Sequence, residues 1–320
     1  MKLLITGVHG FVGSNLVAYF KNDHQLYGLD IVAPEKEGVI KTYSWEDVDN
    51  GTLPDVDAII HLAGKAHDTS NKSEADVYFK VNTDLTKRIF DYFTQHTNIR
   101  KFIFFSSVKA AVDKVPGDIL TEDVKPCPVG PYGESKVKAE EYIQAVLEGN
   151  KDKFYNRNII ILRPCMIHGP GNKGNLNLLY GFVKKGLPWP LGSFNNRRTF
   201  TSVDNLSFVI DGLLSKDVAS GIYNMSDDDA LSTNELINIM CSVMQRRAHI
   251  WKINASLVRF TAKLGDFLHL PLNSFRLTKL TENYVVSNDK IKKALGVNHM
   301  PVDTRTGLKN TIRSFLPMQG

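Results

Sequence analysis

Short apolar runs alternate with longer stretches of mixed apolar and polar residues over the first half of the chain. Runs rich in β-branched and aromatic residues predict strands at residues 2–6, 25–30, 39–42, 58–62, 101–106 and 158–163. Between them, apolar residues recur three or four positions apart and predict helices at residues 11–22, 75–97 and 132–147. This alternation is typical of βαβ units, so the pattern predicts an α/β protein with a doubly wound parallel sheet.

The pattern changes after residue 165. Turn-forming residues are concentrated at 168–175 and 187–196. Several further segments show a helical pattern. They are residues 203–214, 233–245, 254–268, 289–295 and 304–315. We therefore expect a first domain over residues 1–165, to which residues 197–222 return, and a smaller mixed α/β C-terminal lobe over residues 166–320.

Composition and charge exclude several classes of protein. Hydrophobic residues make up 42% of the 320-residue chain and charged residues 23%, which is ordinary for a globular protein. The three scattered cysteines form no CxxC pair, and no His, Cys or Asp cluster has metal-ligand spacing, so neither a disulfide framework nor a metal site is expected. No apolar run approaches the roughly 20 residues of a membrane helix. A net charge of +5 without a Lys/Arg run argues against nucleic acid. We expect a cytoplasmic protein.

The positive charge is concentrated in one stretch. Residues 245–280 contain seven basic residues and one acid, Asp266. The helix predicted within this stretch carries apolar residues on one face: Leu257, Phe260, Leu264 and Phe267. We expect this face to pack on the C-terminal lobe, and the alternative is peripheral contact with an anionic membrane.

Glycines follow the first predicted strand at a spacing that suits nucleotide binding. The run Thr6-Gly-Val-His-Gly-Phe-Val-Gly13 lies between that strand and a predicted helix, so a pyrophosphate can approach the backbone at the helix N-terminus. The second strand ends at Asp30, which can bind the adenosine ribose hydroxyls and repel a 2′-phosphate. These residues predict a Rossmann-type domain that binds NAD in preference to NADP.

Three polar residues further along the chain predict catalysis. Ser107 follows a predicted strand, and Tyr132 and Lys136 stand at positions i and i+4 of a predicted helix, where they share one face. A lysine and a positively charged nicotinamide near the phenol would lower the pKa of Tyr132, which makes it a better base.

Together these motifs resemble the extended short-chain dehydrogenases/reductases, in particular the nucleotide-sugar epimerases, reductases and dehydratases. Further matching motifs occur in family order. They are His61-Leu-Ala-Gly64, Val81-Asn-Thr83, Tyr132-Gly-Glu-Ser-Lys136, Arg163-Pro164, Gly169-Pro-Gly171 and Arg198-Thr-Phe-Thr-Ser-Val-Asp-Asn-Leu206.

The resemblance implies a role for each matching residue. Pyrophosphate would lie on Gly7, Gly10 and Gly13, beside Phe11 and Val12. Asp30 would bind the adenosine ribose, Ala63 and Gly64 would line the cofactor, and Asn82 would brace the site.

The same resemblance implies how a substrate would be held. Ser107 would hydrogen-bond the reacting sugar oxygen, Tyr132 would act as base and acid, and Lys136 would also hold the nicotinamide ribose. Arg198 would clamp the diphosphate of a UDP-sugar, with Asn175 and Arg276 as further candidates for nucleotide contact.

The expected reaction is 4-epimerisation of a UDP-hexose or UDP-N-acetylhexosamine through a 4-keto intermediate, in the synthesis of bacterial surface-polysaccharide precursors. The alternative is an NAD(P)H-dependent reductase of UDP-4-keto-6-deoxy-hexosamines. Dehydratases of the family place an Asp-Glu pair after the catalytic Ser/Thr, whereas this chain has Val108-Lys109, which excludes that reaction. A further alternative is a cofactor-sensing regulator on the same fold. Such a protein would not need the three catalytic residues, so their presence argues against it. Family resemblance also implies a homodimer built through helices 75–97 and 132–147.

Overall fold

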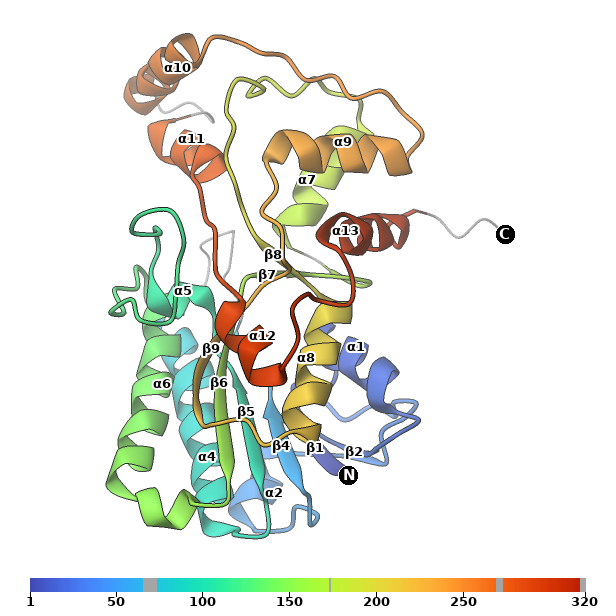
Figure 1. Ribbon diagram of the computed structural model, residues 1–320, viewed down its shortest axis with the longest axis vertical. Helices are drawn as coiled ribbons and strands as arrows, with labels where there is room; N and C mark the ends of the chain where they lie inside the picture. Colours follow the sequence, from blue (N-terminus) through green and yellow to red (C-terminus); the bar gives the residue numbers. More distant parts are fainter. Residues whose placement is uncertain (66–73, 173, 269–272, 317–320) are drawn as a thin grey trace.

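A seven-stranded parallel sheet forms the centre of the molecule in the computed structural model, which describes residues 1–65, 74–172, 174–268 and 273–316 (Figure 1). The strands follow the spatial order β3-β2-β1-β4-β5-β6-β9. Their bounds are β3 Lys41–Tyr43, β2 Gln25–Leu29, β1 Lys2–Thr6, β4 Ala58–His61, β5 Lys101–Phe105, β6 Asn158–Pro164 and β9 Gly221–Met225. This order, with its reversal between β1 and β4, confirms the doubly wound Rossmann-type prediction.

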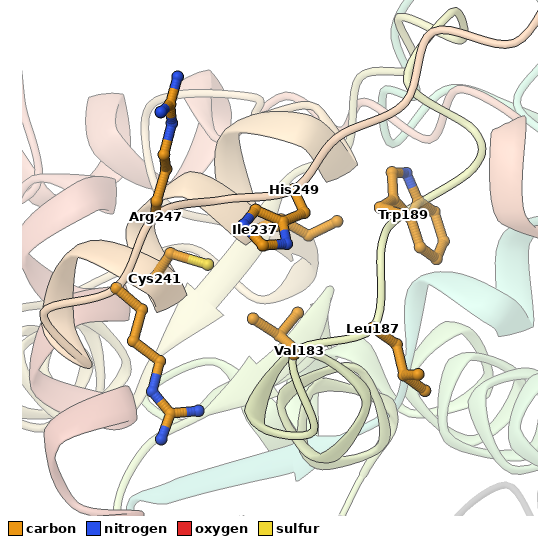
Figure 2. Close-up of a pocket in the computed structure, with 9 residues that line it drawn as sticks. Val183, Leu187, Trp189, Ile237, Cys241, Arg247 and His249 are labelled. Atoms are coloured by element: carbon orange, nitrogen blue, oxygen red, sulfur yellow. The ribbon is translucent and has the colours of Figure 1, made fainter.

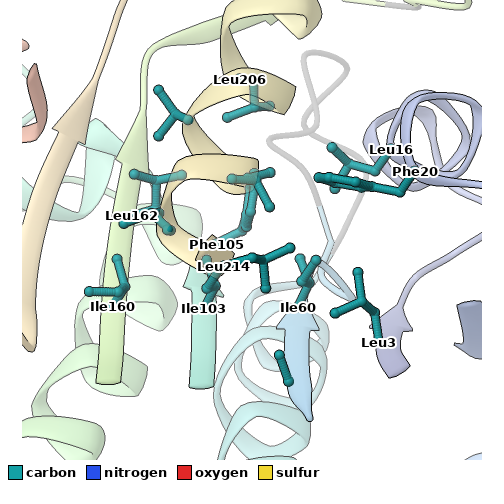
Figure 3. Close-up of a cluster of buried hydrophobic side chains, with 14 of the residues drawn as sticks. Leu3, Leu16, Phe20, Ile60, Ile103, Phe105, Ile160, Leu162, Leu206 and Leu214 are labelled. Atoms are coloured by element: carbon teal, nitrogen blue, oxygen red, sulfur yellow. The ribbon is translucent and has the colours of Figure 1, made fainter. Parts of the chain in front are cut away.

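Both faces of the sheet are covered, which gives three layers. Successive residues of β1 face opposite sides: Leu3 and Ile5 pack toward α1 (Phe11–Phe20) and α8 (Val203–Ser215), as Figure 3 shows for part of this core. Leu4 instead packs toward α2 (Trp45–Asp49), α4 (Leu85–Gln95) and α6 (Pro131–Gly149). Burial on two sides explains why the strands read as nearly continuous apolar runs.

The helix predicted at residues 75–97 is interrupted. It consists of α3 (Ala75–Tyr78), a π-helical turn η1 (Phe79–Asp84) and α4. A π-helical turn inserts a residue into the helical repeat and is found mostly at functional positions. Here it contains Asn82, which is fully buried.

The C-terminal segments build a third apolar cluster above the carboxyl edge of the sheet. Its elements include the parallel pair β7 (Met166–His168) and β8 (Phe200–Ser202), with α7 (Asn175–Lys184), α9 (Thr233–Val243) and α13 (Thr304–Arg313). Helices α10 (Ala255–Leu268) and α11 (Ser274–Thr281) also contribute to this cluster. The remaining elements of the described chain, which pack elsewhere, are α5 (Val108–Ala111), η2 (Lys151–Phe154) and α12 (Asp289–Leu295). The domain boundaries expected at residues 165, 197 and 222 remain a prediction.

Helix α10 packs with the opposite side from the one expected. Its buried residues are Val258, Ala262 and Gly265, whereas Phe260 and Phe267 are exposed. The prediction that the apolar face of this helix packs on the lobe is therefore wrong, because small side chains provide the close contact instead. Within the described ranges, no helix is long and apolar enough to cross a membrane.

Candidate active site

The glycine-rich turn lies at the carboxyl end of β1, beside the end of β4. Gly7 has φ of +68° and donates its N–H to the Leu29 carbonyl at 2.8 Å, and Gly10 donates to the Gly7 carbonyl at 3.0 Å. A Cβ on Gly13 would lie 2.4 Å from the Gly7 oxygen. Helix α1 begins at Phe11, so its first N–H groups and the positive end of its dipole stand at this turn.

Substitution of Gly13 tests whether this close packing shapes the cofactor site. Gly13→Ala is expected to weaken NAD binding at least about tenfold, since the added methyl group must displace the loop backbone. The measurement is NAD titration by calorimetry. Gly181→Ala is the matched control, because a Cβ at Gly181 in α7 meets open space, and it should leave NAD binding unchanged.

The carboxylate of Asp30 is tied to the glycine turn. One oxygen accepts the N–H of His9 at 3.0 Å and the other accepts the N–H of Ile31 at 2.8 Å. A carboxylate has about four acceptor positions. Asp30 therefore both fixes the turn and keeps acceptor capacity for hydroxyl groups.

A chain of hydrogen bonds through His61 joins β1, β4 and the start of α4. Thr86 donates its hydroxyl to the Asn82 carbonyl at 2.7 Å, so its oxygen accepts the N–H of His61 Nε2 at 2.8 Å. The unprotonated Nδ1 then accepts the hydroxyl of Thr6 at 2.7 Å, and the Thr6 oxygen accepts the N–H of Ala63 at 2.9 Å.

This chain requires a neutral imidazole. Burial holds the pKa of His61 well below its ordinary value, and the charge of Lys136 lowers it further. Polar Thr6 and His61 stand at the ends of two buried strands, but nothing in the sequence indicates that they are hydrogen-bonded to each other.

Asn82 holds the segment after β4 against α6. Its amide oxygen accepts the N–H of Lys65 at 2.7 Å, and its amide nitrogen donates to the Lys65 carbonyl at 3.1 Å and to Ser135 Oγ at 3.0 Å. A Cβ on Gly64 would lie 2.9 Å from Asn82 Oδ1 and 3.1 Å from Lys136 Nζ. These contacts fix Asn82 between the end of β4 and α6, and its role in bracing an active site remains a prediction.

Ser107 and Tyr132 meet at the carboxyl end of β5. Ser107 caps α5 and accepts the N–H of Lys109 at 3.2 Å, and it forms a hydrogen bond with Tyr132 that lowers the pKa of the phenol. Burial has the larger effect and raises the pKa of Tyr132. The net shift is upward and Lys136 is not among its causes, so the expectation that this lysine lowers the pKa of Tyr132 is wrong.

Lys136 lies on the same helix with its ammonium group buried. Its Nζ donates to the Phe105 carbonyl at 2.8 Å. Burial lowers its pKa to about 8, and the carboxylate of Glu140 opposes that shift. Glu140 in turn forms a buried ion pair with Arg163, with Arg163 Nε 2.9 Å from one oxygen and Nη2 2.5 Å from the other.

The residues expected to bind substrate lie on separate elements of the C-terminal segments. Arg198 donates to the backbone carbonyls of Lys279 and Glu282 at the end of α11, and Arg276 is exposed on that helix. Asn175 was expected within a turn-rich loop, but it is the first residue of α7 and is exposed. The structure thus brings Arg198 to the helix of Arg276 and places Asn175 on a different element.

A cavity of about 280 Å³ lies between α7 and α9. Figure 2 shows Val183, Ile237, Trp189 and His249 around it. None of the nine residues that line it is among the predicted site residues. In the described part of the chain, no group of three His, Cys, Asp or Glu side chains could hold a metal ion.

Residues 3–239 match the model of the NAD dependent epimerase/dehydratase family. The chain belongs to this family. A UDP-glucose 4-epimerase from Vibrio cholerae is 28% identical over 98% of this chain and 95% of its own length. A GDP-6-deoxy-D-talose 4-dehydrogenase from Aggregatibacter actinomycetemcomitans is 25% identical over 88% of this chain and 94% of its own.

Solved structures share the fold over the whole chain. The structure described as MoeE5 in complex with UDP-glucuronic acid and NAD has a TM-score of 0.75 and 20% identity, over 98% of this chain and 99% of that one. The chain is thus an NAD-dependent enzyme of the epimerase/dehydratase family. The close approach of backbone at Gly7 and Gly13, where a Cβ would clash, fits the dinucleotide.

Proposed function

We propose that the chain is a 4-epimerase of nucleotide sugars that acts on a UDP-hexose or a UDP-N-acetylhexosamine through a 4-keto intermediate. The observation that carries the proposal is the hydrogen bond between Ser107 and Tyr132, with Lys136 one turn further along α6. The name of the Vibrio cholerae relative, which is similar over nearly the whole chain, supports this reaction.

Each catalytic side chain has one task in this proposal. NAD would be held at the glycine turn and Asp30 and would supply the hydride-accepting and hydride-donating group for C4 of the sugar. Tyr132 takes the proton of the C4 hydroxyl through its phenol oxygen and later gives it back, while Ser107 holds the same sugar oxygen. Lys136, whose pKa burial lowers to about 8, supplies positive charge in this buried region while it holds its proton.

Arg198 is the proposed anchor for the diphosphate. Its guanidinium lies at the end of α11 with 26% of the side chain exposed, and it contacts the carboxylate of Glu282 at 3.8 Å. A planar group with five N–H donors can bind a diphosphate while it keeps some of these contacts. If the nucleotide end is held, the 4-keto sugar can rotate to present its opposite face without leaving the pocket.

The test is an assay of C4 inversion. Purified protein without added cofactor is incubated with UDP-glucose, UDP-galactose and their N-acetyl forms, and products are followed by NMR. Inversion of one pair would support an epimerase with its own NAD and would name the substrate. The proposal fails if no sugar inverts even with NAD⁺ supplied.

A reductase of UDP-4-keto-6-deoxy-hexosamines is the second candidate, because the same three side chains suit hydride transfer in one direction. A GDP-6-deoxy-D-mannose reductase from Pseudomonas aeruginosa is 25% identical over 76% of this chain. Consumption of NADH or NADPH by a UDP-4-keto-6-deoxy sugar, in the absence of any inversion, would favour this function.

Asp30 is proposed to set the preference for NAD. Asp30→Asn keeps an oxygen that can accept the His9 N–H but removes the charge that repels a 2′-phosphate. We expect NAD affinity to fall about tenfold, because hydrogen bonds to charged groups are the stronger ones, and NADP to bind relatively better. Calorimetric titration with both cofactors measures this change. Exposed Asp23, changed to Asn, should leave the ratio unaltered.

Location and assembly follow from the same proposal. UDP-sugars and NAD are cytoplasmic metabolites, so the cytoplasm is the proposed place of action, in supply of surface-polysaccharide precursors. A homodimer is proposed through the segment α3-η1-α4 together with α6, which pack against each other along one face of the sheet. Light scattering coupled to size exclusion measures the assembly.

A further inference from the structure

The outer side of α10 carries a continuous apolar strip that is exposed to solvent. Five side chains form it: Leu257, Phe260, Leu264, Phe267 and Leu268, with exposed fractions of 55%, 59%, 43%, 81% and 57%. At about 100° per residue, they fall within an arc of about 100° on the helix. We call these five residues the α10 strip. Exposed apolar patches of this kind mark interaction sites.

The α10 strip is not needed to hold the helix in place. Val258, Ala262 and Gly265 are buried and anchor the other side of α10. Asp266 accepts the N–H of Ser274 at 2.9 Å and its hydroxyl at 2.5 Å, which fastens α10 to α11. Figure 1 shows α10 and α11 at the end of the molecule farthest from the sheet. A flat external surface could therefore reach the strip.

Positive charge borders the strip. Arg259 and Lys263 are exposed and lie on one flank of the five apolar residues. Residues 245–280 have a net charge of +6 in the sequence, within which Lys279 is paired with Asp113 and Glu282, and the rest of the chain has a net charge of −1. Asp266, the acid in this stretch, keeps its negative charge while it accepts hydrogen bonds from Ser274. Apolar side chains flanked by Lys and Arg are the composition of helices that lie in a membrane interface.

We propose that α10 docks the protein on an anionic lipid surface, with the α10 strip inserted among the acyl chains and Arg259 and Lys263 against lipid phosphates. The charge favours this partner over a second copy of the chain, because two such basic segments would repel each other. The inference goes beyond the proposed function and does not depend on it.

Co-sedimentation of the full chain with vesicles tests the proposal. Vesicles of phosphatidylcholine alone are compared with vesicles that also contain phosphatidylglycerol. We expect binding to the anionic vesicles, weakened by added salt, and much weaker binding to the neutral ones. Phe260→Ser with Phe267→Ser should reduce the partition coefficient at least about tenfold, because both rings leave the acyl region.

Two further variants distinguish electrostatic binding from nonspecific adsorption through exposed aromatic side chains. Arg259→Glu with Lys263→Glu should also reduce partitioning at least about tenfold, since each basic residue near the surface contributes about a fivefold factor. Tyr155→Ser is the matched control, because Tyr155 is an aromatic residue 87% exposed and outside α10. It should leave partitioning unchanged.

Three results would overturn the proposal. The first is no sedimentation of the wild type, and the second is sedimentation that the α10 variants leave unchanged. The third is a wild-type oligomer that dissociates in the Phe260/Phe267 variant without vesicles, which would assign the strip to self-association. Melting curves confirm that the variants fold. Because sedimentation requires no turnover, failure of the epimerase assay leaves this test intact.

Discussion

Replacing Tyr132 with Phe should lower kcat about 10²- to 10⁴-fold while NAD still binds. The change removes the phenol oxygen, which takes up and returns the proton in the proposed reaction and forms the hydrogen bond with Ser107. The ring contact with Tyr78, whose centroid lies 6.3 Å away, remains possible for Phe. Single-turnover and steady-state rates of C4 inversion measure the loss.

A control on the same helix separates this effect from a general loss of a phenol. Tyr142 lies on α6 and donates its hydroxyl to Asp91 at 2.5 Å. Tyr142→Phe removes that hydrogen bond outside the candidate site, so it should keep nearly full activity. Equal losses in the two variants would contradict a catalytic role for Tyr132.

Glu140→Ala should destabilise the fold by about 3–5 kcal/mol, because it leaves the buried guanidinium of Arg163 without its carboxylate. Both side chains of the pair are 1% exposed, so water cannot replace the lost partner. Ser106 also donates its hydroxyl to Glu140 and would lose that acceptor. Urea unfolding at neutral pH measures the change in the free energy of unfolding.

Two comparisons make the result specific to the buried pair. Glu141→Ala, at the next position of α6, removes an exposed carboxylate and should change stability by no more than about 0.5 kcal/mol. Glu140→Leu combined with Arg163→Met removes both charges and should recover much of the loss. A double variant as unstable as the single one would show that the ion pair itself is not the cause.

The cost of losing Glu140 should shrink as the pH rises. The folded pKa of Lys136 is about 8, against an ordinary value of 10.5, so the unfolded chain binds more protons between these values. The contribution of Lys136 to the free energy of unfolding therefore increases with pH between about 8 and 10.5. Below this range the folded protein bears the full cost of burying the charged ammonium group. As the pH rises through about 8, Lys136 loses its proton in the folded protein and no longer interacts with the charge of Glu140, so its part of the difference between wild type and Glu140→Ala disappears, whereas the part due to Arg163 remains.

The Rossmann half of the fold could be predicted because each strand is buried on both faces. Such strands are short apolar runs, and those of β1, β4 and β5 end within a residue of the expected positions. Strand β9 was missed, since its sequence GIYNM is short and contains a buried asparagine, Asn224. Its place is determined by pairing with β6, which is not a local property.

Helices α7 and α10 show two ways in which local patterns mislead. Asn175, Asn177 and Gly181 lower the helix propensity of α7, yet packing against α9 compensates for that. In α10 the amphipathic pattern predicts the helix but not which side faces the protein. The short side chains of Val258 and Ala262 allow α10 to pack closely on the rest of the protein, so the larger apolar side chains of the helix face solvent.

The candidate site could be predicted wherever a motif is continuous in the sequence. The glycine turn, Asp30, Ser107, Tyr132 and Lys136 follow from spacing, and the structure adds what supports them. The hydrogen-bonded chain through His61 joins residues far apart in the sequence, which no local pattern indicates. Glu140 stands four residues after Lys136 on the buried side of α6, and only tertiary packing pairs it with Arg163.

Strand β9 pairs with β6 but is synthesised long after it, and this affects both the nascent chain and any truncated form of the protein. During translation, β6 remains an unpaired edge of the sheet until residue 225 has left the ribosome, because its neighbour is made only after β7, α7 and α8. A nascent chain or a proteolytic fragment that stops near residue 165 would expose that edge and recruit other strands. Removal of the C-terminal half should therefore yield an aggregating fragment rather than an independent cofactor-binding module.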